Sequence, residues 1–396
     1  MRTTDFDKTL RIKPWKPDIR LVPHLTIETN MTCNFRCKNC YNYNRDSVKT
    51  LDQIKVEVDL GLKLRKADTI TLIGGEPSLH PQLSEIVGYI SQKGIIAQML
   101  TNGYKHLSDN DDIQLKELKK AGLVRILLHI DDGQKEYKDP IESIHKFLRK
   151  TRKLNILTTV SWTIYRNQSI RIPDLLREFS VYPNFDGLLC VLEKSVDLAI
   201  KPGYSNKEWP LLLSEYENLK RSLNLHPSIF LPSSIDDESV AWLVYMYYIN
   251  NETQKTFWIS PSLTRAYQKL YLRFKKRELF GIPPMRHFFV LTLIVTGVFE
   301  CLIKPRRINE LRNLLKDSKH TGLIRYQYLA IQDGPEFNSE KNRVSICYHC
   351  PDATVRNGRI CPVCLADRIS PLPGKDPPAD VPEGLAVSVF EHLNSK

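Results

Sequence analysis

Between residues 24 and 192, short β-rich runs alternate with longer segments whose apolar residues recur at helical spacing. Six strands that alternate with helices through short connections predict an α/β fold with a parallel sheet or a partial barrel. In such folds the functional residues gather at the carboxyl ends of the strands. The predicted strands are His24–Thr29, Thr69–Ile73, Ile95–Leu100, Val124–Ile130, Ile156–Ile164 and Phe185–Leu192. The predicted helices are Leu51–Lys66, Pro81–Lys93, Ile113–Ala121, Ile141–Leu154 and Ile172–Phe179.

The loop after the first predicted strand carries three closely spaced cysteines. Cys33, Cys37 and Cys40 form the pattern C-x₃-C-x₂-C. Three thiolates at this spacing suit three corners of a cubane iron–sulfur cluster, whereas a zinc site needs a fourth protein ligand. No further Cys or His follows at short range, so one iron would stay open to a small molecule. Taken alone, the triplet is also compatible with three buried cysteines.

Other candidate site residues follow the ends of the next strands. The segment Gly74-Gly75-Glu76-Pro77 follows the second strand. Its glycines allow the backbone to approach a ligand closely, and its carboxylate can accept a hydrogen bond from an ammonium group. Asn102, Asp131 and Ser161 lie at or near the ends of the third, fourth and fifth strands. Each is a weak signal alone, because Asn-Gly and Asp-Gly are common turns.

The cysteine triplet followed by G-G-E-P resembles the radical S-adenosylmethionine (SAM) superfamily. The resemblance implies a partial (β/α)6 barrel and a [4Fe–4S] cluster on the three cysteines, with SAM bound to the open iron. Gly74-Gly75-Glu76-Pro77 would hold the SAM amino group, and Asn102, Asp131 and Ser161 would contact its ribose and carboxylate. One departure is Asn39, which stands where many members have an aromatic residue, with Tyr41 as the nearest substitute.

The implied activity is reductive cleavage of SAM to methionine and a 5′-deoxyadenosyl radical, which abstracts hydrogen from a substrate C–H bond. A low-potential electron donor, flavodoxin or ferredoxin, would supply the electron. The cofactor carries this chemistry, while the protein positions the substrate and excludes water.

A second group of cysteines lies near the C-terminus. It contains Cys347-x₂-Cys350 and Cys361-x₂-Cys364, with Cys301 upstream. Four cysteines alone suit a zinc ribbon or a mononuclear iron knuckle. The segment Thr296–Cys301 resembles the entry to the auxiliary-cluster (SPASM or twitch) regions of many radical SAM enzymes. This favours an auxiliary [4Fe–4S] cluster that recruits Cys301, whereas Cys190 is expected in the core.

The regular alternation stops after residue 192. We expect a helix over Glu208–Leu223, an aromatic-rich helix over Val240–Ile249, a basic amphipathic helix over Arg265–Phe280 and a strand over His287–Phe299. The tail from Pro371 is Pro-rich and expected to be irregular. The resulting division is a lead-in over 1–23, a core barrel over 24–195, a helical segment over 196–286, a metal-binding region over 287–370 and a tail over 371–396.

The net charge of +12 favours an anionic partner, which is a membrane surface, nucleic acid or an acidic redox protein. Met1–Arg20 does not read as a secretory leader, and no apolar run reaches the roughly 20 residues that span a bilayer. Most of the nine cysteines fall in two groups with metal-like spacing. We therefore expect a cytoplasmic protein, peripheral at the inner membrane face if it binds lipid.

The substrate is the least constrained property. The predicted helix Val240–Ile249 and the basic Arg265–Phe280 suit an interfacial position on a membrane, which suggests a lipid alkyl chain as substrate. Packing of both helices over the barrel is the alternative, and a peptide substrate is the second hypothesis. A basic metal-binding protein for nucleic acid is the hypothesis of another class. It leaves the spacing of G-G-E-P unexplained, so nucleic acid is not the expected partner.

Overall fold

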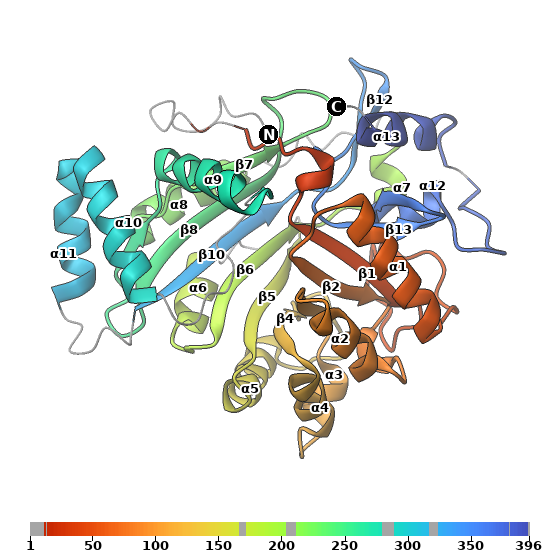
Figure 1. Ribbon diagram of the computed structural model, residues 1–396, viewed down its shortest axis with the longest axis horizontal. Helices are drawn as coiled ribbons and strands as arrows, with labels where there is room; N and C mark the ends of the chain where they lie inside the picture. The colour runs from red at the N-terminus through yellow and green to blue at the C-terminus, as the bar shows by residue number, and fades with distance from the viewer. Residues whose placement is uncertain are drawn as a thin grey trace.

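A computed structural model of the chain describes residue 12 and residues 14–165, 172–202, 211–278, 289–316, 324–379 and 381–394. Its centre is a curved sheet flanked by helices (Figure 1). Six strands, β1 to β6, lie parallel and side by side in chain order, which confirms the predicted parallel α/β core. They are β1 His24–Asn30, β2 Thr69–Gly74, β3 Ile96–Thr101, β4 Leu123–His129, β5 Leu157–Ile164 and β6 Phe185–Leu192.

The helices between these strands also agree with the sequence pattern. They are α1 Leu51–Leu64, α2 Leu83–Gln92, α4 Ile113–Ala121, α5 Pro140–Lys153 and α6 Ile172–Ser180. The short helix α3 (Tyr104–Ser108) precedes α4. Two 3-10 turns are η3 (Ile19–Leu21), before β1, and η4 (Pro77–Leu79), after β2. Local signals fix their ends: Thr50 and Gln53 form a capping box before α1, and Gly122 ends α4 in the left-handed conformation. Cys190 is fully buried in β6, as expected for a core cysteine.

The sheet continues beyond β6 with strands that the sequence pattern did not predict. β10 (Ile324–Gln332) pairs parallel to β6, and β8 (Val240–Asn250) pairs antiparallel to β10. β7 (Ile229–Pro232) and β9 (Thr256–Trp258) pair with β8. One sheet therefore runs through segments that we assigned to the core, the helical segment and the metal-binding region.

The prediction of a helix over Val240–Ile249 is wrong. Every residue of β8 is buried, so its apolar side chains pack on both faces of the sheet. A run that is apolar on all sides has neither helical nor strand periodicity, and its aromatic and β-branched residues then favour a strand.

The prediction of a strand over His287–Phe299 is also wrong, apart from residues 287 and 288, which lie outside the described residues. The segment forms α10 (Phe289–Ile303), which contacts α9 (Pro261–Lys275), the shorter form of the predicted basic helix. Downstream follow η5 (Pro305–Arg307) and α11 (Ile308–Lys316). Buried Glu300 on α10 pairs with Arg307 at 2.7 Å. No helix of the described ranges is long and apolar enough to cross a membrane.

The C-terminal region packs against the first strand of the barrel. Its β13–β14 hairpin contacts β1 and α1, and it lies at the opposite side of the molecule from α10 and α11 (Figure 1). The region contains β11 Glu336–Asn338, β12 Arg343–Ser345, β13 Ala353–Arg356, β14 Arg359–Pro362, η7 Val363–Leu365, α12 Ala366–Ile369 and α13 Leu385–Asn394. Helix α13 corrects the expectation of an irregular tail, because Leu385, Val389 and Leu393 recur every four residues and are buried. Two further helices, α7 Val196–Ala199 and α8 Leu211–Leu223, connect β6 to β7.

Candidate active site

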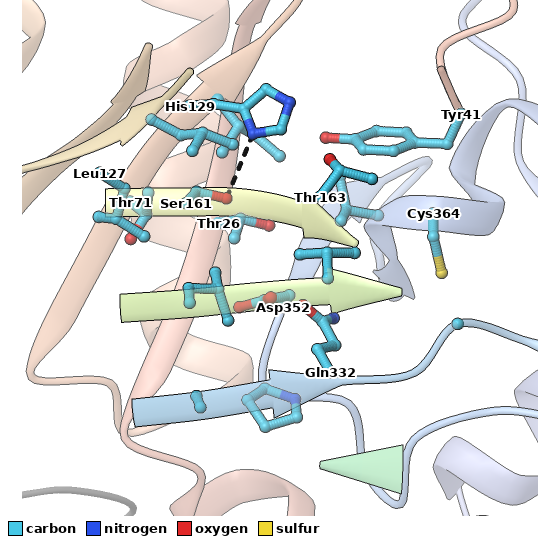
Figure 2. A pocket seen from close by; sticks show the side chains of 18 of the residues that line it. Thr26, Tyr41, Thr71, Leu127, His129, Ser161, Thr163, Gln332, Asp352 and Cys364 are labelled. Atoms are coloured by element: carbon cyan, nitrogen blue, oxygen red, sulfur yellow. Dashed lines mark hydrogen bonds between the residues drawn. The ribbon is translucent and has the colours of Figure 1, made fainter. Parts of the chain in front are cut away.

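A cavity of about 480 Å³ lies against the inner face of the curved sheet. Its wall consists of alternate residues of neighbouring strands, because successive side chains of a strand point to opposite faces. Figure 2 shows several of these side chains, among them Thr26, Thr71, Leu127, Ser161 and Gln332. The same cavity is lined by cysteines of both groups. The two cysteine groups therefore share one space, although more than 300 residues separate them in the sequence.

The first group lies in the loop between β1 and α1. Cys33, Cys37 and Cys40 are all half-buried and all line the cavity. Phe35 anchors the loop, because it is 2% exposed and packs edge-on against Tyr104, with ring centroids 5.4 Å apart.

The surroundings of this loop disfavour free thiolates. Burial, with Cys40 and Cys33 nearby, raises the pKa of Cys37 to about 12. Such a thiol stays protonated at neutral pH unless a cation stabilises its thiolate. Three soft donors on one cavity wall are the ligand set that a cubane cluster requires.

Gly74 ends β2 and Gly75 follows it, and the two pack on the end of β1 and the start of the cysteine loop. A Cβ atom added to Gly75 would lie 2.2 Å from the carbonyl oxygen of Thr32, and one added to Gly74 would lie 2.0 Å from that of Asn30. We expected these glycines to admit a ligand. In the structure they admit the backbone of the cysteine loop, and they also line the cavity. Pro77 starts η4 and is not among the lining residues.

The carboxylate of Glu76 ties the ends of two strands together. It accepts hydrogen bonds from Thr101 Oγ1 at 2.6 Å, from the Asn102 backbone N–H at 2.7 Å and from the Ser78 backbone N–H at 3.0 Å. Burial raises its pKa, against the effect of these bonds. A carboxylate has about four acceptor positions, so one remains for the expected ammonium group.

Asn102 and Ser161 also line the cavity. Asn102 Nδ2 donates to Asn34 Oδ1 of the cysteine loop at 2.8 Å. Ser161 Oγ lies 3.3 Å from His129 Nδ1, as the dashed line in Figure 2 marks. Both side chains therefore lie on the wall of the cavity that the cysteine loop also lines.

Asp131 lies behind the cavity wall. It is fully buried, is not among the lining residues, and accepts hydrogen bonds from the Gly133 N–H at 2.8 Å and the Tyr165 hydroxyl at 3.1 Å. Its carboxylate is also 3.5 Å from His129 Nε2. Asp131 thus positions Tyr165 and His129, which do line the cavity. Alternate residues of β4 line the cavity, and this alternation in the sequence could have identified His129 as a site residue.

The second group faces the same cavity from the C-terminal region. Cys347, Cys350 and Cys364 line it, whereas Cys361 is fully buried beside them. Trp242 Nε1 donates to Cys347 Sγ at 3.2 Å. A hydrogen bond with Cys347 and burial raise the pKa of Cys350, and burial with Cys347 nearby raises that of Cys364 to about 12. These thiols therefore interact as one group.

Arg65 gives an independent indication of what the second group binds. It is fully buried at the end of α1, and it donates to the backbone carbonyls of His24, His349, Cys350 and Pro351. Its Nε atom has no partner among the described residues, and burial lowers its pKa to about 10. A buried guanidinium needs a negative charge nearby. Asp352 supplies one such charge, and a metal bound by four thiolates would add to it, so the donor set and Arg65 fit such a group. As placed, no three His, Cys, Asp or Glu side chains of the described ranges already form an ion-binding cluster.

Cys301 does not belong to this site, which corrects the expectation from the sequence. It lies on α10, at the opposite side of the molecule from β13 and α12 (Figure 1). Burial raises its pKa, and the charged groups that act on it are Arg307, Glu300 and Glu310. The segment Thr296–Cys301 that suggested its role is part of this helix.

Three comparisons bear on identity. Residues 27–176 match the family model described as radical SAM superfamily. A protein of Methanocaldococcus jannaschii with the provisional name glycyl-radical enzyme activating enzyme is 27% identical over 224 residues, which cover 52% of this chain and 75% of that protein. The GTP 3′,8-cyclase of Yersinia pestis is 32% identical over 115 residues, which cover 27% of this chain and 33% of the cyclase.

Among solved structures, Streptococcus suis SuiB bound to S-adenosylmethionine aligns with a TM-score of 0.39 and 16% identity, over 50% of this chain and 47% of SuiB. The chain thus spans a third of the cyclase and about half of SuiB. The matched segment 27–176 contains Cys33, Cys37, Cys40 and the G-G-E-P turn on the cavity wall. From this match and this placement, residues 27–176 form a domain of the radical SAM superfamily, and the relatives named above are enzymes.

Proposed function

We propose that a [4Fe–4S] cluster on Cys33, Cys37 and Cys40 binds and reductively cleaves SAM in the barrel cavity, and that hydrogen is then abstracted from a substrate held below it. The observation that carries the proposal is the placement of three half-buried cysteines on the wall of a cavity that also exposes Gly75, Glu76 and Asn102. When bound, the cluster and SAM together supply a carbon-centred radical, which is strong enough to attack an unactivated C–H bond.

The residues of the chain have distinct tasks in this proposal. Gly74 and Gly75 keep the cysteine loop against β2, and the remaining acceptor position of Glu76 faces the SAM ammonium group. Ser161, His129 and Tyr165 offer hydroxyl and ring nitrogen groups to the ribose and carboxylate of SAM. Asp131 acts through His129 and Tyr165 and is a positioning residue.

The electron is proposed to come from flavodoxin or ferredoxin, which are acidic proteins. The net charge of +12 favours such a partner. Lys38, inside the cysteine loop, leaves 76% of its side chain exposed and offers this partner an ammonium whose charge is partly compensated by Glu193 at 3.3 Å.

The second group is proposed to hold one auxiliary metal centre on Cys347, Cys350, Cys361 and Cys364, without Cys301. Zinc, mononuclear iron and a [4Fe–4S] cluster all accept four cysteines. We favour the cluster because three of the four cysteines line the cavity, where a redox group could bind substrate or take back an electron. A structural zinc site would gain nothing from that position.

The structure removes part of the case for a lipid substrate. The polar side chains of the cavity wall, such as Thr71, Arg125 and Tyr328, are already paired with His24, Asp186 and Thr159, so they do not select between a polar and an apolar substrate. The strand Val240–Asn250 removes one of the two segments that suggested a membrane contact. We therefore propose a peptide side chain, which is the second hypothesis from the sequence, rather than a lipid.

The test is anaerobic reconstitution with iron and sulfide, followed by measurement of 5′-deoxyadenosine formed from SAM and dithionite. We expect SAM-dependent product in the parent protein and none without reductant. Peptide, small-molecule and lipid fractions of a cell extract are then added separately. A peptide fraction should raise the rate at least about fivefold. Stimulation by the lipid fraction alone would contradict the substrate class, and absence of 5′-deoxyadenosine under all conditions would contradict the activity.

A further inference from the structure

The short helix α12 connects the two cysteine groups through two buried side chains. It begins two residues after Cys364 and carries Asp367 and Arg368, which are 3% and 4% exposed. Asp367 Oδ2 accepts hydrogen bonds from the backbone N–H groups of Tyr43 at 2.8 Å and Asn44 at 3.0 Å.

Arg368, the next residue of α12, adds a hydrogen bond to the same segment. Its Nη1 donates to the backbone carbonyl of Tyr41 at 2.9 Å. Tyr41, Tyr43 and Asn44 lie one, three and four residues after Cys40. Three hydrogen bonds from α12 thus fix the backbone that directly follows the third cysteine of the first group. We call these three bonds the α12 contact.

A buried ionic network supports the α12 contact. Asp367 Oδ1 pairs with Arg356 Nη2 at 3.1 Å, and Arg356 makes a bidentate pair with Glu28 at 2.5 and 2.8 Å. Glu28 lies in β1, which leads into the cysteine loop. The loop is therefore held at its entrance by β1 and at its exit by α12, with Arg356 of β13 between them.

The position of α12 depends on the turn that precedes it. A helix of four residues, Ala366–Ile369, has no stability of its own. It follows the η7 turn, which contains Cys364, and this turn is tied to the second group by the hydrogen bond from Val363 N–H to the Asp352 carbonyl at 3.1 Å. A metal bound to Cys361 and Cys364 would fix this turn and α12 with it.

We propose that occupancy of the C-terminal cysteine site positions the radical cluster loop through Asp367 and Arg368. This inference rests on the proposed function, because it requires a metal at the C-terminal cysteines. Loss of that metal loosens the turn before α12, which leaves α12 held only by its ion pairs with Arg356 and Asp197, and the three hydrogen bonds to the segment after Cys40 then open more often. The auxiliary centre thereby keeps the loop of Cys33, Cys37 and Cys40 in position. This role is independent of any role in electron transfer or substrate binding.

Hydrogen exchange of the amides of Tyr43 and Asn44 tests this directly, with no need for turnover. The parent protein is compared anaerobically with Cys361→Ala/Cys364→Ala and with Asp367→Ala. Both variants should exchange at least about tenfold faster at these amides, because the lost bonds go to a charged group. Amides of β3 serve as the reference for a folded barrel.

A matched control keeps the test specific. Lys375 and Asp46 form an exposed pair at 2.6 Å between the same two regions. Lys375→Gln should leave the exchange of Tyr43 and Asn44 within about twofold of the parent, because exposed pairs contribute little. Parent-like exchange in Asp367→Ala would overturn the proposal, as would parent-like exchange in the double cysteine variant after its metal loss is confirmed.

Two further outcomes are decisive. Faster exchange of the β3 amides in Asp367→Ala would mean that the barrel itself has opened. In that case Asp367→Asn is measured instead, because it keeps an acceptor oxygen but loses the charge that faces Arg356. Severalfold faster exchange in that variant supports the proposal, and parent-like exchange overturns it. If metal analysis finds nothing at the C-terminal cysteines of the parent, the proposed auxiliary centre fails, and the inferred metal dependence fails with it. The Asp367→Ala result would still show whether the α12 contact holds the loop.

Discussion

The two cysteine groups use similar spacing in different surroundings. Cys33, Cys37 and Cys40 lie in an irregular loop and are half-buried, whereas Cys347, Cys350 and Cys361 are buried, with Trp242 bonded to Cys347 and Arg65 to Cys350. The first arrangement suits a metal group that must stay open to a small molecule. The second suits a closed group with its charge compensated inside the protein. The proposed roles of the two cysteine groups are therefore distinguished by their burial and their neighbouring residues more than by the spacing of the cysteines.

The largest effect should come from the open group. Cys33→Ala, Cys37→Ala or Cys40→Ala should each reduce 5′-deoxyadenosine formation to background, because a cubane with two protein ligands is not retained. Metal bound to the C-terminal cysteines should remain, as measured by metal analysis of the purified variants. Parent-like 5′-deoxyadenosine from the triple variant would contradict the enzymatic proposal.

The next effect concerns the closed group. In Cys347→Ala/Cys350→Ala the buried guanidinium of Arg65 keeps only Asp352 as a nearby negative group. We expect the free energy of unfolding to fall by about 3 kcal/mol or more, as measured by denaturant titration. The variant should also lose one metal centre. Iron and zinc analysis of the parent then identifies it: iron for close to two cubanes supports the auxiliary cluster, and one zinc with iron for a single cubane supports a zinc site.

A smaller effect on stability is expected from a buried histidine of the barrel that belongs to neither cysteine group. His106 of α3 is 1% exposed, neither ring nitrogen has a partner among the described residues, and burial lowers its pKa to about 4. The unfolded chain therefore binds this proton near pH 6.5, whereas the folded chain does not. Stability that is present above pH 6.5 is lost as the pH falls toward 4.

Between pH 7 and pH 5 this loss amounts to roughly 2 kcal/mol. His106→Leu should reduce the acid sensitivity by that amount, measured as the change in unfolding free energy at the two pH values. An unchanged pH slope would show that His106 is not a neutral buried group.

The smallest effect is expected at Cys301. It lies on α10, away from the other cysteines. Cys301→Ala should leave the metal content unchanged and shift the unfolding free energy by no more than about 0.5 kcal/mol. Loss of metal in this variant would restore the five-cysteine site that the sequence suggested.

The sequence by itself determined the parallel core and most of its candidate ligands. Strands β1 to β6 and the helices between them were predictable because each has its own periodicity and its own turn or cap. The triplet Cys33, Cys37 and Cys40 and the turn at Gly74 and Gly75 were predictable because they are local patterns that follow strand ends.

Only the tertiary structure decided the rest. β8 and α10 are apolar on all sides, so their sequences carry no period, and their partners in the fold select strand or helix. The contacts of Arg65 with Cys350 and of Asp367 with Tyr43 join residues 285 and 324 positions apart. Hydrogen bonds between residues so far apart in the sequence depend on how the C-terminal region packs on β1, and no local sequence pattern encodes that packing.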